Sequence, residues 1–293
     1  MKKAVVIFNP TAGLLSKRDL KSEVEAKLRE VGIEPDFLIL DSNFEKLVAD
    51  YDWSGTELVI AWGGDGTAKV AARTIMQFKL SVPLGIIPFG SANVLASTLK
   101  IPFNISEAIK LIGKGRTSNI DIGRINKEKY FLVGFSMGYV SSIIINTEKE
   151  LKNKFGFLGY AIRLFWNKVR ITRTKFRIET QNRTFWIKGN SLIVFNAFNF
   201  YGFQAKKHIS ISDGLLNLYV VTNKNFFSMI EAAFGVLFYD NPPKHIFALD
   251  NREFKITLKY RRQLKTCQID GDYIKLDKEI VIDVLPGALQ VIF

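Results

Sequence analysis

The chain has 293 residues, of which 41 are lysine or arginine and 28 are aspartate or glutamate, giving a formal net charge of +13. This length favours one large or two ordinary domains, and the positive charge favours nucleic acid, an anionic membrane surface or phosphorylated ligands as partners. One cysteine, Cys267, and two histidines exclude a disulfide framework and a Cys/His zinc site, which favours a reducing compartment.

The first part of the chain alternates strand-like and helix-like segments. Apolar runs rich in β-branched residues predict strands, and apolar residues at helical spacing, such as Leu20, Val24 and Leu28, predict helices. In chain order we expect a strand at 3–8, a helix at 16–32, a strand at 35–41, a helix at 44–51, a strand at 57–62, a helix at 67–78, a strand at 83–88, a helix start near 94 and a helix at 106–115. This alternation predicts an α/β domain over residues 1–118, with a parallel sheet covered by helices.

From residue 119 onward, apolar and polar residues alternate, as is typical of antiparallel strands. Strand-like runs lie at 129–138, 175–197, 215–222, 254–260, 266–276 and 279–293. Helix-like insertions near 155–168 and 226–239 interrupt them, and the second is too short to span a bilayer. We therefore expect a mainly antiparallel β-rich domain over 119–286.

The N-terminal apolar run stops at Asn9 and Pro10, which indicates a strand rather than a signal peptide.

A glycine-rich turn follows the expected strand at 57–62. The sequence GGDGT places Gly63, Gly64 and Gly66 around Asp65, directly before a helix. Backbone amides without side chains can approach phosphate oxygens, assisted by the N-terminus of the helix, and Asp65 could contact magnesium or a hydroxyl. The alternative is an ordinary strand-to-helix turn that needs glycine for its backbone conformation.

Two other turns follow strands of the same predicted sheet. They are NPTAG, from Asn9 to Gly13, and PFGSAN, from Pro88 to Asn93. Because the carboxyl ends of parallel strands meet at one edge, we expect the three loops to converge on one crevice. Neither GxxxxGK[ST] nor a complete GxGxxG is present.

Taken in order, six motifs of the chain resemble the bacterial diacylglycerol kinase and lipid kinase family. They are NPTAG, GGDGT, PFGSANVLA, SDGLLNLYVV (Ser212 to Val221), QIDGD (Gln268 to Asp272) and LPGAL. NAD kinases, sphingosine kinases and phosphofructokinases have turns similar to GGDGT, and the downstream motifs favour the lipid kinases. The resemblance implies an α/β nucleotide-binding domain, a β-rich domain and an active site in the cleft between them. It also implies that the last strand, 287–293, returns to the first domain.

The resemblance implies roles for particular residues. The phosphates and ribose of ATP would contact Asn9, Pro10, Thr11, Ala12, Gly13, Gly64, Asp65, Gly66, Thr67 and Ser91, the last in place of a family threonine. Asp272, which replaces the glutamate of a family DGE motif, would be the general base. Asp65 is the second catalytic candidate, by analogy with sphingosine kinases. The alternative for Asp272 is a plain Asp-Gly hairpin turn.

A magnesium site is implied by Ser210, Asp213 and the backbone carbonyl of Leu215, which supply oxygen ligands suited to a hard cation. This ion would be structural and distinct from the one bound to ATP. The alternative is an Asp-Gly turn that leads into a strand.

Three further positions depart from the family pattern. Lys69 and Val70 stand where many members carry an Asn-Glu pair, and Val94 stands where an acidic residue is common. A polar network near the nucleotide is therefore in doubt. Lys69 could approach a phosphate or be a solvated helix lysine.

The region from Lys149 to Lys188 combines lysine and arginine with aromatic residues. This composition suits peripheral attachment to an anionic membrane, and RNA contacts or a solvated face are the alternatives.

The sequence therefore predicts an ATP- and magnesium-dependent lipid kinase that phosphorylates a hydroxyl of diacylglycerol or a related lipid. We expect it to be cytoplasmic and peripheral at the inner membrane surface, and we expect no nucleic acid partner. A soluble kinase similar to NAD kinase, or a catalytically impaired nucleotide- or lipid-binding protein, is the alternative. The lipid and the oligomeric state, a homodimer among the options, are left open.

Overall fold

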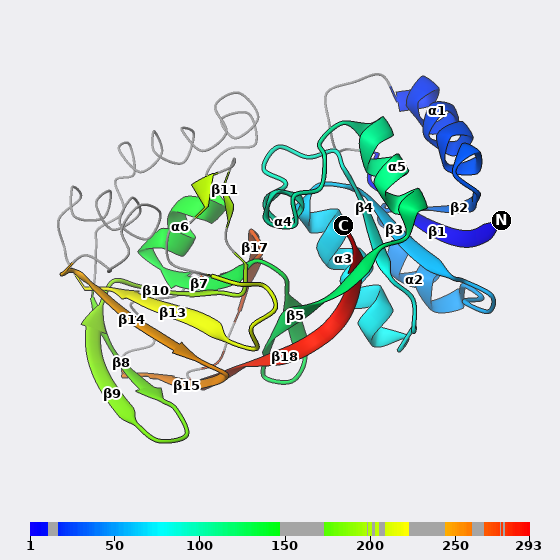
Figure 1. Cartoon of the computed structure of the whole chain (residues 1–293). Helices are drawn as coiled ribbons and strands as arrows, with labels where there is room; N and C mark the ends of the chain where they lie inside the picture. Colours follow the sequence, from blue (N-terminus) through cyan, green and yellow to red (C-terminus); the bar gives the residue numbers. More distant parts are fainter. Residues whose placement is uncertain are drawn as a thin grey trace. The chain divides into compact units, whose positions relative to one another are not determined.

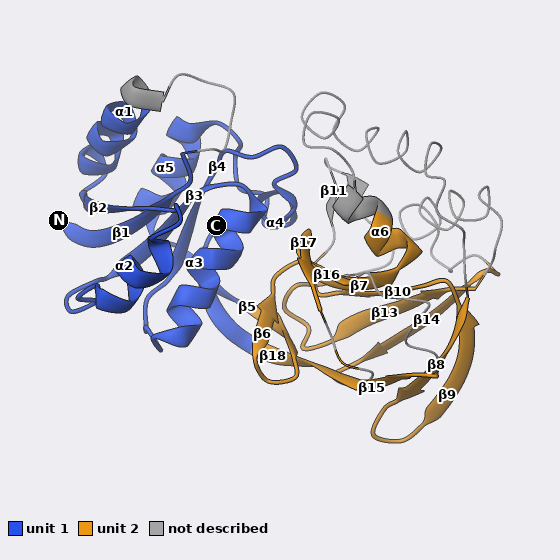
Figure 2. Ribbon diagram, turned by 180° about the vertical axis from the view of Figure 1, so that it is seen from behind, with its two compact units in different colours: residues 1–120, 287–293 blue, residues 121–286 orange. Residues whose placement is uncertain are grey.

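The computed structural model describes residues 1–10, 17–146, 173–197, 199–200, 203–204, 209–222, 244–259, 267–275, 277 and 279–293. Its contacts divide the chain into two compact units (Figure 2). Unit 1 is Met1–Ile120 with Gly287–Phe293, and unit 2 is Asp121–Pro286. Two strands, β5 (Thr117–Ile125) and β18 (Glu279–Ile292), carry the chain from one unit into the other.

Unit 1 is a parallel sheet with helices on both faces (Figure 1). Its other elements are β1 (Lys2–Phe8), α1 (Lys17–Glu30), β2 (Ile33–Ile39), α2 (Phe44–Asp50), β3 (Leu58–Gly63), α3 (Asp65–Gln77), β4 (Leu84–Pro88), α4 (Val94–Thr98) and α5 (Ile105–Lys114). The strand order is β2-β1-β3-β4, followed by the end of β18, which pairs in parallel with β4 at Val291 and Leu84. Hydrophobic strands buried on both faces are typical of such sheets.

Helices α1 and α5 cover one face of this sheet, and α2 and α3 cover the other (Figures 1 and 2). Val24, Leu28, Ile109 and Ile112 from α1 and α5 share a core with Trp62 and other apolar side chains of the strands. On α3 the buried residues include Ala68, Ala71 and Ala72, whose small side chains let the helix approach the sheet closely.

Local signals set the ends of α5. The Asn104 side chain accepts a hydrogen bond from the backbone N–H of Glu107, and Gly115 ends the helix with a φ of 65°. Both features are preferred at helix ends, because they satisfy backbone groups that the helix leaves without partners.

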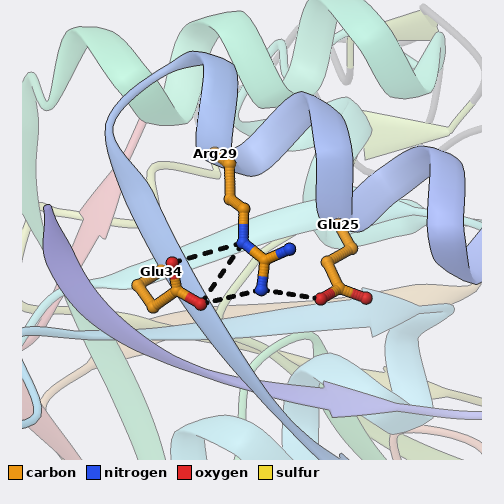
Figure 3. A network of polar contacts seen from close by, with 3 residues as sticks. All are labelled: Glu25, Arg29 and Glu34. Atoms are coloured by element: carbon orange, nitrogen blue, oxygen red, sulfur yellow. Dashed lines mark hydrogen bonds and ion pairs between the residues drawn. The ribbon is translucent and has the colours of Figure 1, made fainter.

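An exposed ion-pair network joins α1 to β2 (Figure 3). The Arg29 guanidinium lies 2.9 Å from the Glu25 carboxylate and 2.9 Å from that of Glu34. The hydrogen bonds from Arg29 hold the pKa of Glu34 below its usual range. Arg29 and Glu34 are exposed and Glu25 is half-buried, so the network adds little to stability.

The described part of unit 2 contains strands of two large antiparallel sheets and the two-stranded pair β11–β12. Its further elements are β6 (Lys129–Phe131), β7 (Gly134–Gly138), α6 (Tyr139–Asn146), β8 (Thr174–Glu179), β9 (Thr184–Gly189), β10 (Ser191–Phe195), β11 (Asn199–Phe200), β12 (Phe203–Gln204), β13 (Leu216–Val221), β14 (Ile246–Asn251), β15 (Glu253–Leu258), β16 (Cys267–Ile269) and β17 (Asp272–Ile274). One sheet has the order β14-β13-β10-β7-β16-β17, and in the other β15 pairs with both β18 and β8, and β8 with β9. Apolar residues of both sheets, among them Phe135, Leu218, Phe176 and Phe254, form one core.

The expected fold class, an α/β part and an antiparallel β-rich part, is confirmed. The pattern missed α6 and β14, and the helix expected from residue 67 begins at Asp65, so the acid of GGDGT lies in a helix rather than in a loop. The helices expected at 155–168 and 226–239 lie outside the described residues.

Candidate functional site

The carboxyl ends of β1, β3 and β4 lie side by side in unit 1. The backbone N–H of Asn9 donates to the carbonyl of Trp62 at 3.2 Å, and that of Phe89 donates to the carbonyl of Gly63 at 2.7 Å. The residues that follow the three strands therefore start at one edge of the sheet. Asn9 and Pro10 are half-buried there, whereas Thr11, Ala12 and Gly13 lie outside the described residues.

Two glycines bring the turns after β3 and β4 into contact. A Cβ atom added at Gly90 would lie 2.5 Å from the Cα atom of Gly64, which is backbone and cannot move aside. A Cβ added at Gly66 would meet nothing within 4 Å. Gly90 is therefore needed for packing, whereas the absence of a side chain at Gly66 leaves open space beside the first turn of α3.

The Asp65 carboxylate joins these turns. Its Oδ2 accepts a hydrogen bond from the N–H of Val94 at 3.0 Å, and its Oδ1 accepts one from the N–H of Leu95 at 3.0 Å. Burial raises the pKa of the Asp65 carboxyl above its usual range, although the N–H donors of Leu95 and Val94 oppose this shift. Asp65 thus satisfies the first N–H groups of α4, a role in positioning that the sequence did not indicate.

Asn93 closes the turn after β4. It has a φ of 47°, its Oδ1 accepts from the N–H of Gly90 at 3.0 Å, and its Nδ2 donates to the carbonyl of Gly90 at 2.8 Å. Asparagine tolerates this left-handed conformation better than most residues. Ser91, in the same turn, is exposed.

Thr67 is almost fully buried, at 1% exposure, under the turn after β3. Its Oγ1 has no hydrogen-bond partner among the described residues, and a Cβ at Gly63 would lie 2.2 Å from that oxygen. A buried hydroxyl without a partner at a suspected binding edge is unusual.

In unit 2, Ser210 and Asp213 form a tight turn before β13. The Asp213 Oδ1 accepts a hydrogen bond from the N–H of Leu215 at 2.9 Å, and the Ser210 Oγ accepts one from the N–H of Ser212 at 3.3 Å. Burial, together with the nearby carboxylates of Asp121 and Asp250, raises the pKa of Asp213. The three predicted metal-binding residues are thus neighbours in one turn.

Asp121 lies beside this turn. It is 2% exposed, its N–H donates to the carbonyl of Ile211 at 2.7 Å, and its Oδ2 accepts from the N–H of Gly214 at 2.7 Å. The Nδ2 of Asn196 donates to the carbonyl of Asp121 at 2.9 Å. Sequence reasoning missed both side chains. The signal for Asp121 was a single acid between two isoleucines of an apolar strand.

The QIDGD motif forms the hairpin between β16 and β17. Asp270 and Gly271 have φ angles of 47° and 91°, as a two-residue turn of type I′ requires. The Asp270 carboxylate accepts three hydrogen bonds of 2.9–3.0 Å, from the N–H groups of residues 132–134. Asp272 is exposed at the start of β17. Asp270 therefore anchors the hairpin that carries the predicted base.

Two features are absent from the described residues. No group of three or more His, Cys, Asp or Glu side chains in this part of the chain is arranged to hold a metal ion. The predicted magnesium site includes only one such side chain, that of Asp213, because its other two ligands would be a hydroxyl and a backbone carbonyl. No helix among the described residues combines the length and the hydropathy needed to cross a bilayer.

Comparison with known proteins agrees with the motifs. Residues 3–125 match the family model described as the diacylglycerol kinase catalytic domain. The chain is 30% identical over 242 residues to the protein named probable lipid kinase YegS of Salmonella arizonae, which covers 80% of this chain and 78% of the relative. It is also 30% identical to a protein named probable lipid kinase YegS-like of Klebsiella pneumoniae, with 80% of this chain and 77% of the relative covered.

A solved structure supports the fold. A diacylglycerol kinase from Bacillus anthracis str. Sterne superimposes with a TM-score of 0.77 at 20% identity, covering 100% of this chain and 97% of that one. At this identity the likeness concerns the fold. Together with the identity to the named lipid kinases, it confirms the resemblance seen in the motifs. The chain belongs to the diacylglycerol kinase and lipid kinase family.

Proposed function

We propose that the chain transfers the γ-phosphoryl group of ATP, with magnesium, to a hydroxyl of diacylglycerol or a related membrane lipid. The observation that carries this proposal is the edge of the sheet in unit 1, where Asp65 and the pair Gly64 and Gly90 join two glycine turns at the end of a 13-residue helix. Family membership supplies the acceptor class.

The residues at this edge fit the phosphates of a nucleotide. The N-cap of α3 is Gly64, whose side-chain-free backbone lies at the positive end of the helix dipole. No described atom lies within 4 Å of a Cβ added at Gly66, in the first turn of α3, and the buried hydroxyl of Thr67 has no partner in the part of the chain that the structure describes. By contrast, the first N–H groups of α4 are occupied by Asp65, so α3 is the helix expected to face the ligand.

The turn at residues 210–215 fits a hard cation. It offers a hydroxyl, a carboxylate and a backbone carbonyl, the oxygen donors that magnesium prefers. Asp121 and Asp250 add negative charge near Asp213, which a bound cation would neutralise. The other magnesium ion, bound with ATP, would neutralise phosphate charge during transfer.

We assign the general base to Asp272. Its carboxylate is exposed at the start of β17, so it can accept a proton from a hydroxyl that reaches it. The anchoring of Asp270 to residues 132–134 fixes the hairpin and hence the position of this carboxylate.

We further propose that the enzyme works as a peripheral protein at an anionic membrane surface, since its acceptor resides in the bilayer.

The test is incubation with radiolabelled ATP, magnesium and a total lipid extract, followed by separation of labelled lipids. We expect one lipid-dependent labelled product, which disappears when magnesium is chelated. Asp272→Asn should lose most of this activity, Asp272→Glu should retain it, and Asp277→Asn, which changes an exposed acid nearby, is the matched control. Labelling of NAD instead of lipid, or nucleotide binding without any product, would contradict the proposal.

A further inference from the structure

One outer face of unit 2 is unusually rich in cations. Strands β8, β9 and β15 direct Phe176, Phe254 and other apolar side chains into the core, so the alternate residues point outward. On β8 and β9 the outward set includes Lys175, Arg177, Trp186 and Lys188, and on β15 it includes Lys259 beyond the strand end. We call these five residues the lysine–tryptophan face, and four of them are cationic.

Three lysines of this face form a row across the strands. Lys175 lies directly opposite Lys188 in the β8–β9 register, and the N–H of Lys259 donates to the carbonyl of Lys175 at 3.1 Å. All three side chains are exposed. Like charges at directly opposed positions destabilise a sheet, so the row is explained more readily by an anionic partner than by folding.

Trp186 stands beside this row on β9, the edge strand of the sheet (Figure 1). It is 54% exposed, which is the largest exposure of any tryptophan or phenylalanine among the exposed large hydrophobic residues of the described chain. The Lys175 ammonium lies 4.7 Å from its ring centroid, and the Arg177 guanidinium carbon lies 6.0 Å away. An indole ring with cations over its face suits the boundary between lipid headgroups and acyl chains, where tryptophan is enriched.

Two acidic side chains near this face form ion pairs with cations of the same sheet. Glu179 pairs with Arg177 at 2.7 Å, and Glu279 pairs with Lys255 at 2.9 Å. Neither of these pairs includes Lys175 or Lys188. The face therefore presents positive charge and one exposed aromatic ring, which complements a negatively charged surface.

We propose that the lysine–tryptophan face docks the chain onto an anionic bilayer, with the lysine row on the headgroups and Trp186 inserted at the interface. This inference rests on the proposed function, in which the acceptor lipid resides in a membrane. It locates the membrane contact on described residues of β8, β9 and β15, while residues 149–172 of the basic region expected from Lys149 to Lys188 lie outside the described residues.

The experiment measures flotation of the full chain with vesicles of phosphatidylcholine alone and with added phosphatidylglycerol, without ATP. The double variant Lys175→Glu, Lys188→Glu keeps like charges opposed but reverses their sign. Because each lysine near an anionic surface contributes substantially to attachment, we expect its partition onto anionic vesicles to fall by about tenfold or more. The matched control, Lys46→Glu with Lys110→Glu, makes the same change in net charge at exposed positions of unit 1 and should retain binding.

Tryptophan fluorescence tests insertion directly. Brominated phosphatidylglycerol should quench the wild-type chain, and Trp186→Phe should lose most of that quenching while its melting temperature is unchanged. Equal weakening by both double variants would reduce the effect to net charge and overturn the proposal, as would quenching that survives in Trp186→Phe. Tighter binding of a labelled RNA, lost in the Lys175→Glu, Lys188→Glu variant, would assign the face to nucleic acid instead.

Failure of the docking proposal is distinguishable from failure of the proposed function. Phosphorylation of a short-chain diacylglycerol in detergent micelles needs no bilayer, so it reports the activity alone. Vesicle binding without ATP reports the docking alone. Wild-type activity on micelles combined with unchanged vesicle binding in the Lys175→Glu, Lys188→Glu variant would overturn the docking proposal and leave the kinase proposal standing.

Discussion

Asp65 and Asp270 each accept hydrogen bonds from backbone N–H groups of a distant segment. Asp65 binds the first N–H groups of α4, and Asp270 binds three N–H groups of residues 132–134. Hydrogen bonds to an ionised acceptor are roughly twice as strong as neutral ones, so each carboxylate fixes a segment distant in sequence. Neither contact could be inferred from the motif in which the aspartate lies.

Removing the Asp65 carboxylate should lower stability. In Asp65→Ala the N–H groups of Val94 and Leu95 lose their acceptor, and we expect a loss of about 1.5–3 kcal/mol of unfolding free energy. Urea unfolding checks this value. Asp50→Ala, at the exposed end of α2, is the control and should change stability by less than about 0.5 kcal/mol. Equal stability of the two variants would show that the contacts of Asp65 contribute nothing.

Substitution of Asp270 should lower stability, whereas substitution of Asp272 should lower activity. Asp270→Asn keeps a residue that tolerates the φ of 47° but replaces one acceptor oxygen with a donor, so we expect a loss of about 1–3 kcal/mol. Asp272→Asn, at an exposed position, should melt like the wild type yet lose about 10²–10⁴-fold in lipid phosphorylation. Differential scanning calorimetry and the labelling assay measure the two effects. Full activity in Asp272→Asn would place the base elsewhere, with Asp65 the next candidate.

Cys267 should be unreactive in the folded chain. It is 5% exposed, and burial raises the pKa of its thiol from 9.0 to about 12. Because this folded-state pKa is raised, the stability that comes from burying the neutral thiol is fully present below about pH 9 and is lost as the pH rises toward 12. A thiol reagent such as Ellman's reagent should label the chain at pH 8 only after denaturant is added. Rapid labelling of the native chain would contradict the burial.

At the scale of elements, the turns after β3 and β4 show why glycines of one motif differ in role. The backbone of Gly64 blocks any side chain at position 90, whereas space is open at Gly66. The need for glycine at position 90 therefore comes from packing within unit 1. A need for glycine at position 66 would come from a ligand, because a methyl group there would meet no described atom of the chain within 4 Å.

The matched pair Gly90→Ala and Gly66→Ala tests this distinction. Gly90→Ala should destabilise unit 1, since its Cβ would overlap the backbone of Gly64. Gly66→Ala should raise stability by up to about 1 kcal/mol, because alanine favours a helix over glycine, but should abolish the rise in melting temperature caused by ATP. Thermal shift with and without nucleotide is the measurement. An undiminished ATP shift in Gly66→Ala would remove the first turn of α3 from the phosphate site.

At the scale of the whole molecule, the two predicted binding sites fall in different units. The nucleotide residues lie in unit 1, and the turn at 210–215 lies in unit 2. A ligand that binds only the native state stabilises it according to its concentration and affinity. Each ligand should therefore act on stability through a separate set of residues.

Metal removal tests this separation. We expect magnesium to raise the melting temperature without nucleotide and EDTA to reverse the rise. Asp213→Asn should lose the magnesium response, while Gly66→Ala should keep it. A magnesium response that persists undiminished in Asp213→Asn would exclude the turn at 210–215 as the cation site.

The sequence alone determined the elements of unit 1 and the β-rich character of unit 2. Periodicity and helix-end signals are short-range: the apolar spacing of α1 and Gly115 after α5 act within a few residues of the structure they specify. The same holds for the Asp-Gly hairpin of QIDGD. The element α6 was missed because it contains three consecutive isoleucines, and a short apolar run of β-branched residues does not distinguish a helix from a buried strand.

Which distant groups meet depends on the packing of the whole chain. It places Asp65 on the N–H groups of residues 94 and 95, Asp121 on Gly214, and Asp270 on residues 132–134. It also returns the end of β18 to β4, a pairing that family resemblance implied and local pattern could not. An aspartate carries the same local signal whether its partner is a metal, a substrate or a backbone amide, because the partner is brought to it by the packing of residues far away in the chain.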